Sequence, residues 1–279
     1  MKRWIIIAAV IIVAIGAFVV ADTCIFQKKE EPVIPGETSY PIDRQAREPE
    51  ADLSEQTGQR PVIITEIPVS REERDRSFDE MKTELAQVCR ELESKDYIKV
   101  YKIEGGLHAR LDAMIEKLAY RPPVVSGETK DLYSLLSNAA HFYRVLGRED
   151  ILLLKDILSH ERDRIEPLMS LLFQYLIKGS SEHKLNVNIG QLYEYAGFFL
   201  NTLGGQSYLY RRDSVTRTLT KYYSVLILDM ADKEKMNPYG IDIRPHLTLI
   251  QEDMRILGGL KNSGIYQARL KEIEASIIR

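Results

Sequence analysis

Residues 77–92 read SFDEMKTELAQVCREL, a run whose large apolar side chains return every three or four positions. Those positions are Phe78, Met81, Leu85, Val88 and Leu92. Side chains at this spacing share one face of an α-helix, and Ser77 is a suitable N-cap residue. Because the pattern covers only about two heptads, it is too short to indicate a coiled-coil dimer. It predicts the first helix of a bundle.

The helical period continues almost to the C-terminus, and no convincing pair of strands interrupts it. Further helices are expected at about 96–120, 128–146, 149–178, 188–203, 207–232, 244–260 and 264–278. In the helix at 128–146, Leu132, Leu135 and Leu136 are expected to face the core, and Pro167 should kink the helix at 149–178. The fold class is therefore all-α, with about eight helices in a bundle or an array of helical hairpins.

The helical part, residues 73–279, has possible halves at 73–178 and 187–279, separated by a polar loop. A faint repeat relates them at an offset of 57 residues. The matched pairs are Leu135 and Leu192, Ala139 and Ala196, Phe142 and Phe199, Leu146 and Leu203, Gly147 and Gly204, Leu152 and Leu209, and Asp156 and Asp213. Duplication explains this match, but so does the ordinary pattern of any helical hairpin.

The N-terminal residues 1–22 are expected to form a transmembrane signal-anchor. Lys2 and Arg3 precede an uncharged apolar run, residues 4–21, which as a helix would span about 27 Å of a bilayer core that is about 30 Å thick. The positive-inside rule then places the N-terminus in the cytoplasm and the rest outside it, in the periplasm if the chain is bacterial. A cleaved signal peptide ending near Ala21 is the alternative, although this apolar run is longer than most signal peptides have.

Residues 23–72 form a different kind of segment, an extended linker. They hold six of the eleven prolines and more acidic than basic residues, with no lasting helical or strand period. Within the linker, the apolar stretch 61–69 contains Ile63, Ile64 and Ile67. Its β-branched residues and flanking prolines favour an extended conformation that could bind a partner protein. The alternative is that this stretch packs back onto the chain's own helical domain.

Composition excludes several classes of function. A net charge of -3 argues against a nucleic-acid partner, and two cysteines are too few for a disulfide scaffold or a Cys-rich zinc module. The five histidines fit no zinc or di-iron motif, and there is no phosphate-binding loop or nucleophile elbow. No catalytic residue, metal or cofactor is therefore assigned. Glu128, Glu194 and Asp213 are examples of carboxylates that a hydrolase could use.

The second half is rich in tyrosine and arginine. If one helix covers 207–232, Tyr210, Arg217 and Lys221 share a face, and this composition is typical of protein-binding hot spots. The alternative is structural, because tyrosine rings pack well between helices and arginine stems cover them.

These observations predict a non-enzymatic, membrane-anchored scaffold or adaptor that binds a protein partner in the membrane or envelope through its extracytoplasmic helical domain. The contact with lipid is through residues 4–21. A cell-envelope hydrolase and a ligand-binding sensor are the alternatives, and the oligomeric state is left open.

Overall fold

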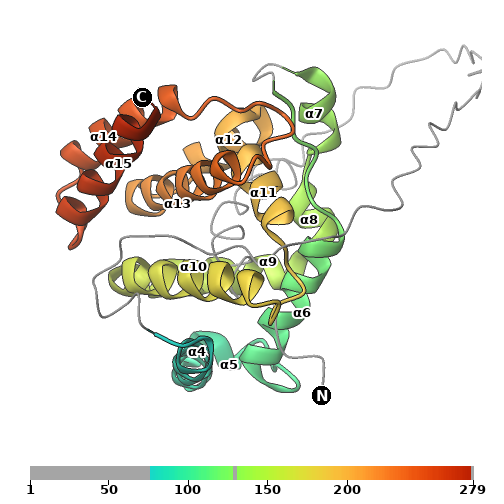
Figure 1. Ribbon diagram of the computed structural model, residues 1–279. Coiled ribbons are helices and arrows are strands. Elements are labelled where there is room, and N and C mark those ends of the chain that lie inside the picture. The colour runs from blue at the N-terminus through green and yellow to red at the C-terminus, as the bar shows by residue number, and fades with distance from the viewer. Residues whose placement is uncertain (1–75, 128–130, 278–279) are drawn as a thin grey trace, which may run out of the picture.

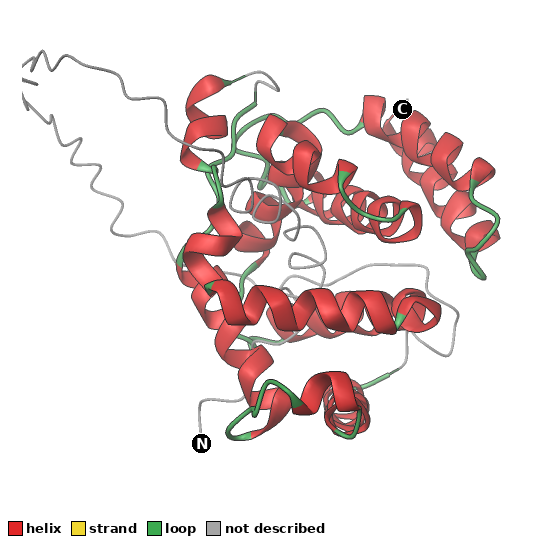
Figure 2. Ribbon diagram, turned by 180° about the vertical axis from the view of Figure 1, so that it is seen from behind, coloured by secondary structure: helices red, strands yellow, loops and turns green. Residues whose placement is uncertain are grey.

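The computed structural model describes residues 76–127 and 131–277, and in these residues every regular element is a helix (Figure 2). The all-α prediction is confirmed for this part of the chain. The predicted anchor, residues 1–22, and the whole of the predicted linker, residues 23–72, lie outside the described residues. Among the described helices, none is both long and apolar enough to cross a membrane.

The first group of helices runs from residue 78 to residue 181. It comprises α4 (Phe78–Glu93), α5 (Asp96–Lys99), α6 (Gly106–Tyr120), α7 (Leu132–Ser137), α8 (His141–Leu146), α9 (Arg148–His160), the 3₁₀ turn η1 (Arg162–Arg164) and α10 (Ile165–Ser181). The second group comprises α11 (Ile189–Asn201), α12 (Leu203–Tyr210), α13 (Ser214–Lys233), α14 (Arg244–Ile256) and α15 (Ser263–Ile277).

Helix α4 forms where its sequence predicts it. The Ser77 hydroxyl accepts a hydrogen bond from the Glu80 N–H at 3.2 Å, and the Glu80 carboxylate accepts one from the Ser77 N–H at 2.7 Å. This capping box satisfies backbone N–H groups that have no partner within the helix. The predicted apolar face is buried at Phe78, Met81, Leu85 and Leu92, whereas Val88 is partly buried at its edge.

The described helices are shorter and more numerous than the eight predicted, because several predicted helices are broken. Gly105 and Gly106, at φ values of +76° and +88°, separate α5 from α6. Ala140, at φ +51°, separates α7 from α8. The expected kink at Pro167 is wrong. The chain breaks earlier, at Glu161 and η1, and Pro167 lies in the first turn of α10, where its missing N–H costs no helical hydrogen bond.

The two predicted halves share one hydrophobic core. Helices α4 and α5 lie at one end of the molecule and α14 and α15 at the opposite corner, with α10, α11 and α13 between them (Figure 1). One continuous cluster of buried apolar residues extends from α4 to α15. Its aromatic centre joins Phe142 of α8 to Tyr195, Phe198 and Phe199 of α11, with ring centroids 5.8–6.2 Å from that of Phe142.

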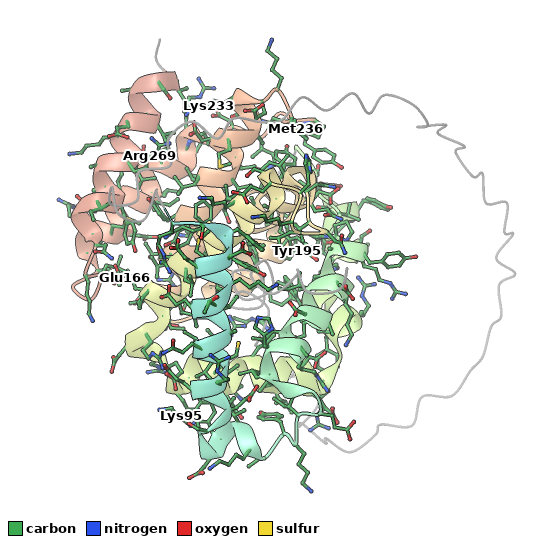
Figure 3. The ribbon with its side chains drawn as sticks, turned by 60° about the horizontal axis from the view of Figure 1, so that its bottom comes forward. Lys95, Glu166, Tyr195, Lys233, Met236 and Arg269 are labelled. Atoms are coloured by element: carbon green, nitrogen blue, oxygen red, sulfur yellow. The ribbon has the colours of Figure 1, made fainter. Side chains whose placement is uncertain are left out.

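Polar contacts also cross between the halves. The Glu166 carboxylate at the start of α10 accepts the N–H groups of Lys261 and Asn262, both at 2.8 Å (Figure 3). The Asn201 side chain donates to the Ser126 carbonyl at 2.8 Å. The faint repeat does not produce two equivalent units, since Gly147 ends α8 at φ +85° whereas its counterpart Gly204 lies within α12.

Candidate protein-docking surface

Tyr210, Arg217 and Lys221 do not lie on one helix, so the geometric basis of their grouping is wrong. Tyr210 ends α12, whereas Arg217 and Lys221 belong to α13. The chain breaks between them because the Asp213 carboxylate caps α13, accepting the Thr216 N–H at 3.0 Å. The Lys221 ammonium is 2.9 Å from the Asp253 carboxylate of α14, so that charge helps to join two helices.

Most tyrosines of the second half pack between helices, which was the structural alternative to a binding role. Buried residues of this type are Tyr193, Tyr195, Tyr208, Tyr222, Tyr223 and Tyr266. The Tyr195 hydroxyl, for example, donates to the Leu118 carbonyl at 2.9 Å and so fastens α11 to α6. Tyr210 is different, because 74% of its surface is exposed.

Helix α7 is one of several places where the described chain exposes large apolar side chains, and it exposes three of them within five residues. Leu132, Tyr133 and Leu136 are 65%, 69% and 65% exposed. The prediction that Leu132 and Leu136 face the core is therefore wrong. The helix itself is well initiated, since the Asp131 carboxylate accepts the N–H groups of Tyr133 and Ser134, each at 3.0 Å. Only Ser134 of α7 is fully buried.

Helices α7 and α12 touch at one end. A Cβ at Gly204 of α12 would lie 3.6 Å from the Cβ of Asn138, the C-cap residue that follows α7. Asn138 is in turn fixed by two hydrogen bonds to Val124, accepting from its N–H at 2.9 Å and donating to its carbonyl at 2.6 Å. The end of α7 is thus held firmly, although most of its apolar side chains point to solvent.

Arginine residues surround the same region. Arg144 of α8 donates to the carbonyl of Ser137, the last residue of α7. Burial raises the pKa of Tyr208 to about 12, while the nearby positive charges of Arg144, Arg211 and Arg212 act in the opposite direction. Within residues 76–127 and 131–277, no carboxylate forms an ion pair with Arg144 or Arg211.

We call the exposed residues of these two helices and their flanking arginines the α7–α12 surface. It comprises Leu132, Tyr133, Leu136, Arg144, Tyr210 and Arg211. Exposed apolar and aromatic side chains beside arginine are the composition found at the centres of protein interfaces.

Two of the three carboxylates considered for hydrolysis, Asp213 and Glu194, lie within the described residues. Asp213 caps α13, Glu128 lies outside the described residues, and Glu194 is a partly buried side chain of α11 whose pKa is raised by burial. In the described ranges there is also no group of three or more His, Cys, Asp and Glu side chains suited to hold a metal ion.

Sequence reasoning singled out Tyr210 and predicted a helix over α7, but it did not foresee the exposure of α7. In LYSLL at 132–136, the four apolar side chains spread over roughly 160° of the helix, at about 100° per residue. So short a helix can press only part of so wide an arc against a neighbouring helix. Ile63, Ile64 and Ile67, the other predicted contact, lie outside the described residues.

Comparisons of this chain with protein-family models, with curated proteins and with solved structures find no significant match.

Proposed function

We propose that this chain is a membrane-anchored scaffold or adaptor whose helical domain, held outside the cytoplasm, binds another protein through the α7–α12 surface. The observation that carries the proposal is the exposure of Leu132, Tyr133 and Leu136 on one short, firmly capped helix. Full burial of a large apolar side chain stabilises a folded protein by about 1.5–3 kcal/mol. The folded domain does not gain this free energy for the three exposed side chains of α7. A protein partner that covers α7 would recover that free energy.

The arginines support a protein partner over a purely apolar one. Arg144 already donates to the Ser137 carbonyl, but neither Arg144 nor Arg211 has a carboxylate partner within the described part of the domain, so both can pair with acidic groups of another chain. Arginine at an interface also gives specificity, because its planar group binds carboxylates with defined geometry. The apolar run at residues 4–21 and the linker supply the anchoring part of the proposal.

The test is affinity capture of the full-length protein from gently solubilised membranes, with the captured proteins identified. A reproducible partner is expected with the unaltered chain and should be lost with Tyr133→Asp and Leu136→Asp. These positions are exposed, so the variants should keep the thermal stability of the original chain within about 1 °C.

Leu249→Asp on α14 is the matched control, because Leu249 is 59% exposed and lies on a different helix. It should capture the partner as well as the unaltered chain does. If the control loses the partner and the α7 variants keep it, the docking surface lies on α14. If no partner is ever recovered, the scaffold proposal fails.

A further inference from the structure

A small apolar groove lies between α4 and α10. Its walls are Val88 and Leu92 of α4 and Pro167, Leu168 and Leu171 of α10, and its volume is about 100 Å³. One water needs about 10–15 Å³ by the same measure, so the groove has room for a larger group, such as one branched aliphatic side chain. The groove runs along the side of α4 from Glu84 to Leu92.

The charges at the rim of the groove already have partners. Glu161 accepts a hydrogen bond from the Tyr97 hydroxyl at 2.7 Å and pairs with Arg164 at 3.4 Å. Arg164 also contacts Glu91 at 2.9 Å. A charged side chain entering this groove would have to displace one of these contacts, whereas an apolar side chain would leave them intact. The groove therefore selects an aliphatic occupant.

The chain enters the described domain at the seam between α4 and α10, near Lys178, whereas the groove is lined by the other end of α10. Arg76 forms an ion pair with Glu84, which itself lines the groove, and the Arg76 carbonyl accepts a hydrogen bond from Lys178 near the end of α10. Two contacts thus hold Arg76 at the seam between α4 and α10. The distance that a residue before Arg76 can reach is therefore measured from that seam.

The nearest strongly apolar segment before Arg76 is Val62–Val69. Ile67 precedes Arg76 by nine positions, enough for an extended chain to reach about 30 Å. Val88, in the middle of the groove, lies only about 18 Å along α4 from Arg76 at 1.5 Å per residue. Ile67 can therefore reach the groove with slack, and it is a branched aliphatic residue of the kind that the groove admits.

We propose that Val62–Val69 docks against its own helical domain, with the Ile67 side chain in the groove between α4 and α10. This contact would fix the end of the linker to the domain and leave the α7–α12 surface, which belongs to other helices, free for a partner. The inference does not depend on the proposed scaffold function, since it concerns one chain alone.

The first test compares Ile67→Asp with Ile34→Asp in the full-length protein in mild detergent. Both isoleucines lie in the linker and each is followed directly by proline, so the two changes are chemically matched. Ile67→Asp should lower the Tm of the helical domain by about 4 °C or more, because it removes a buried side chain. Ile34→Asp should not change the Tm. Equal Tm values for the two variants would overturn the proposal.

The second test locates the segment by disulfide formation. In a Cys24→Ser background, where the buried Cys89 is the only other thiol, Ile67→Cys is combined with Glu84→Cys or with Thr83→Cys. These two positions are adjacent on α4, but Glu84 lines the groove whereas Thr83 lies on the opposite flank of the helix.

Mild oxidation should form the bond to position 84 at least tenfold faster than the bond to position 83, and within one chain. Equal rates would show that the segment has no preferred side of α4 and would overturn the proposal. A bond formed mainly between two chains would also overturn it, because the occupant of the groove would then come from a second copy.

Discussion

His141 shows how strongly burial acts on a single residue. Its ring lies 5% exposed among Phe142, Tyr195 and Phe198, with its Nε2 3.5 Å from the Tyr195 hydroxyl. Burial lowers the pKa of His141 to about 4, and the positive charge of Arg144 acts in the same direction. The folded protein therefore keeps this imidazole neutral at pH values where the unfolded chain would protonate it.

This difference predicts a loss of stability in acid. The unfolded pKa of His141 is near 6.5 and the folded pKa is about 4, so the unfolded state binds the extra proton between these values. Stability is therefore complete above about pH 6.5 and falls as the pH decreases toward 4, by on the order of 3 kcal/mol. His141→Phe should remove this part of the pH dependence, as measured by urea unfolding at pH 7.5 and pH 5.

For each protein, the free energy of unfolding at pH 5 is subtracted from that at pH 7.5. The carboxylates titrate alike in the unaltered chain and in the variant, so they contribute equally to the two differences. If His141→Phe loses as much free energy of unfolding between pH 7.5 and pH 5 as the unaltered chain, His141 is not the group responsible. Tyr195 keeps its bond to the Leu118 carbonyl in the variant, so no buried hydroxyl is left without an acceptor.

Individual residues were predictable from sequence where their role is local. Ser77 was identified as an N-cap because the cap and the N–H that it accepts are neighbours in sequence. The exposure of Leu132 and Leu136 was not predictable in this way, since it depends on which helices cover α7 in three dimensions. The same holds for Tyr208, which is buried, and Tyr210, which is exposed although it lies only two residues further along α12.

At the scale of elements, the close crossing of α11 and α12 depends on one glycine. A Cβ at Gly205 would lie 1.9 Å from the Phe198 carbonyl oxygen and 2.8 Å from the Phe199 Cα. Both are backbone atoms of α11, so no side-chain rotation can relieve the clash. The start of α12 can approach α11 this closely only because Gly205 has no side chain.

Gly205→Ala should therefore destabilise the domain by about 3 kcal/mol or more, because the two helices must move apart. Gly204→Ala is the matched control. Its Cβ would meet Phe198 Cε2 at 3.5 Å and Asn138 Cβ at 3.6 Å, which is ordinary contact. The control should be neutral or stabilising by up to about 1 kcal/mol, since alanine favours the helix. Urea unfolding measures both, and equal effects would contradict the assigned crossing.

Periodicity predicted that elements exist and are helical but not where they break. The boundaries that it found are those with local signals, such as the cap at Ser77 and the glycine at 147 that follows α8. The break at Ala140 has no such signal, because alanine ordinarily favours a helix. That break turns α8 so that Phe142 enters the aromatic centre of the core, which is a tertiary effect.

At the scale of the whole molecule, the N-terminus and the helical domain should lie on opposite sides of one membrane. A reporter that is active only outside the cytoplasm, fused after Arg279, should be active, because Lys2 and Arg3 favour a cytoplasmic N-terminus. The protein should also remain with membranes after alkaline washing. Release into the soluble fraction, with a mature N-terminus at Asp22, would contradict the anchor and support a cleaved signal peptide.

The association of the two halves is the feature that sequence could least predict. Helical periodicity marks which face of a helix is apolar, but it does not say which other helix covers that face. The Phe173 ring of α10 lies 4.7 Å from that of Tyr223 on α13, and Glu166 of α10 binds the backbone just before α15. Neither pairing has a signal in the sequence around it.

These contacts predict that 73–178 and 187–279 are not independent domains. A fragment covering residues 72–279 should unfold in one cooperative transition, with helical circular dichroism and tyrosine fluorescence changing together. Fragments 72–186 and 187–279 should each be poorly folded, because separation exposes the side of α10 that packs on α13 and the side of α11 that packs on Phe142. Mixing the two fragments should restore part of the helical signal, since the core is complementary. If either fragment alone unfolds cooperatively at the melting temperature of the whole, the shared core does not stabilise the halves, and the division seen in the sequence is a true domain boundary.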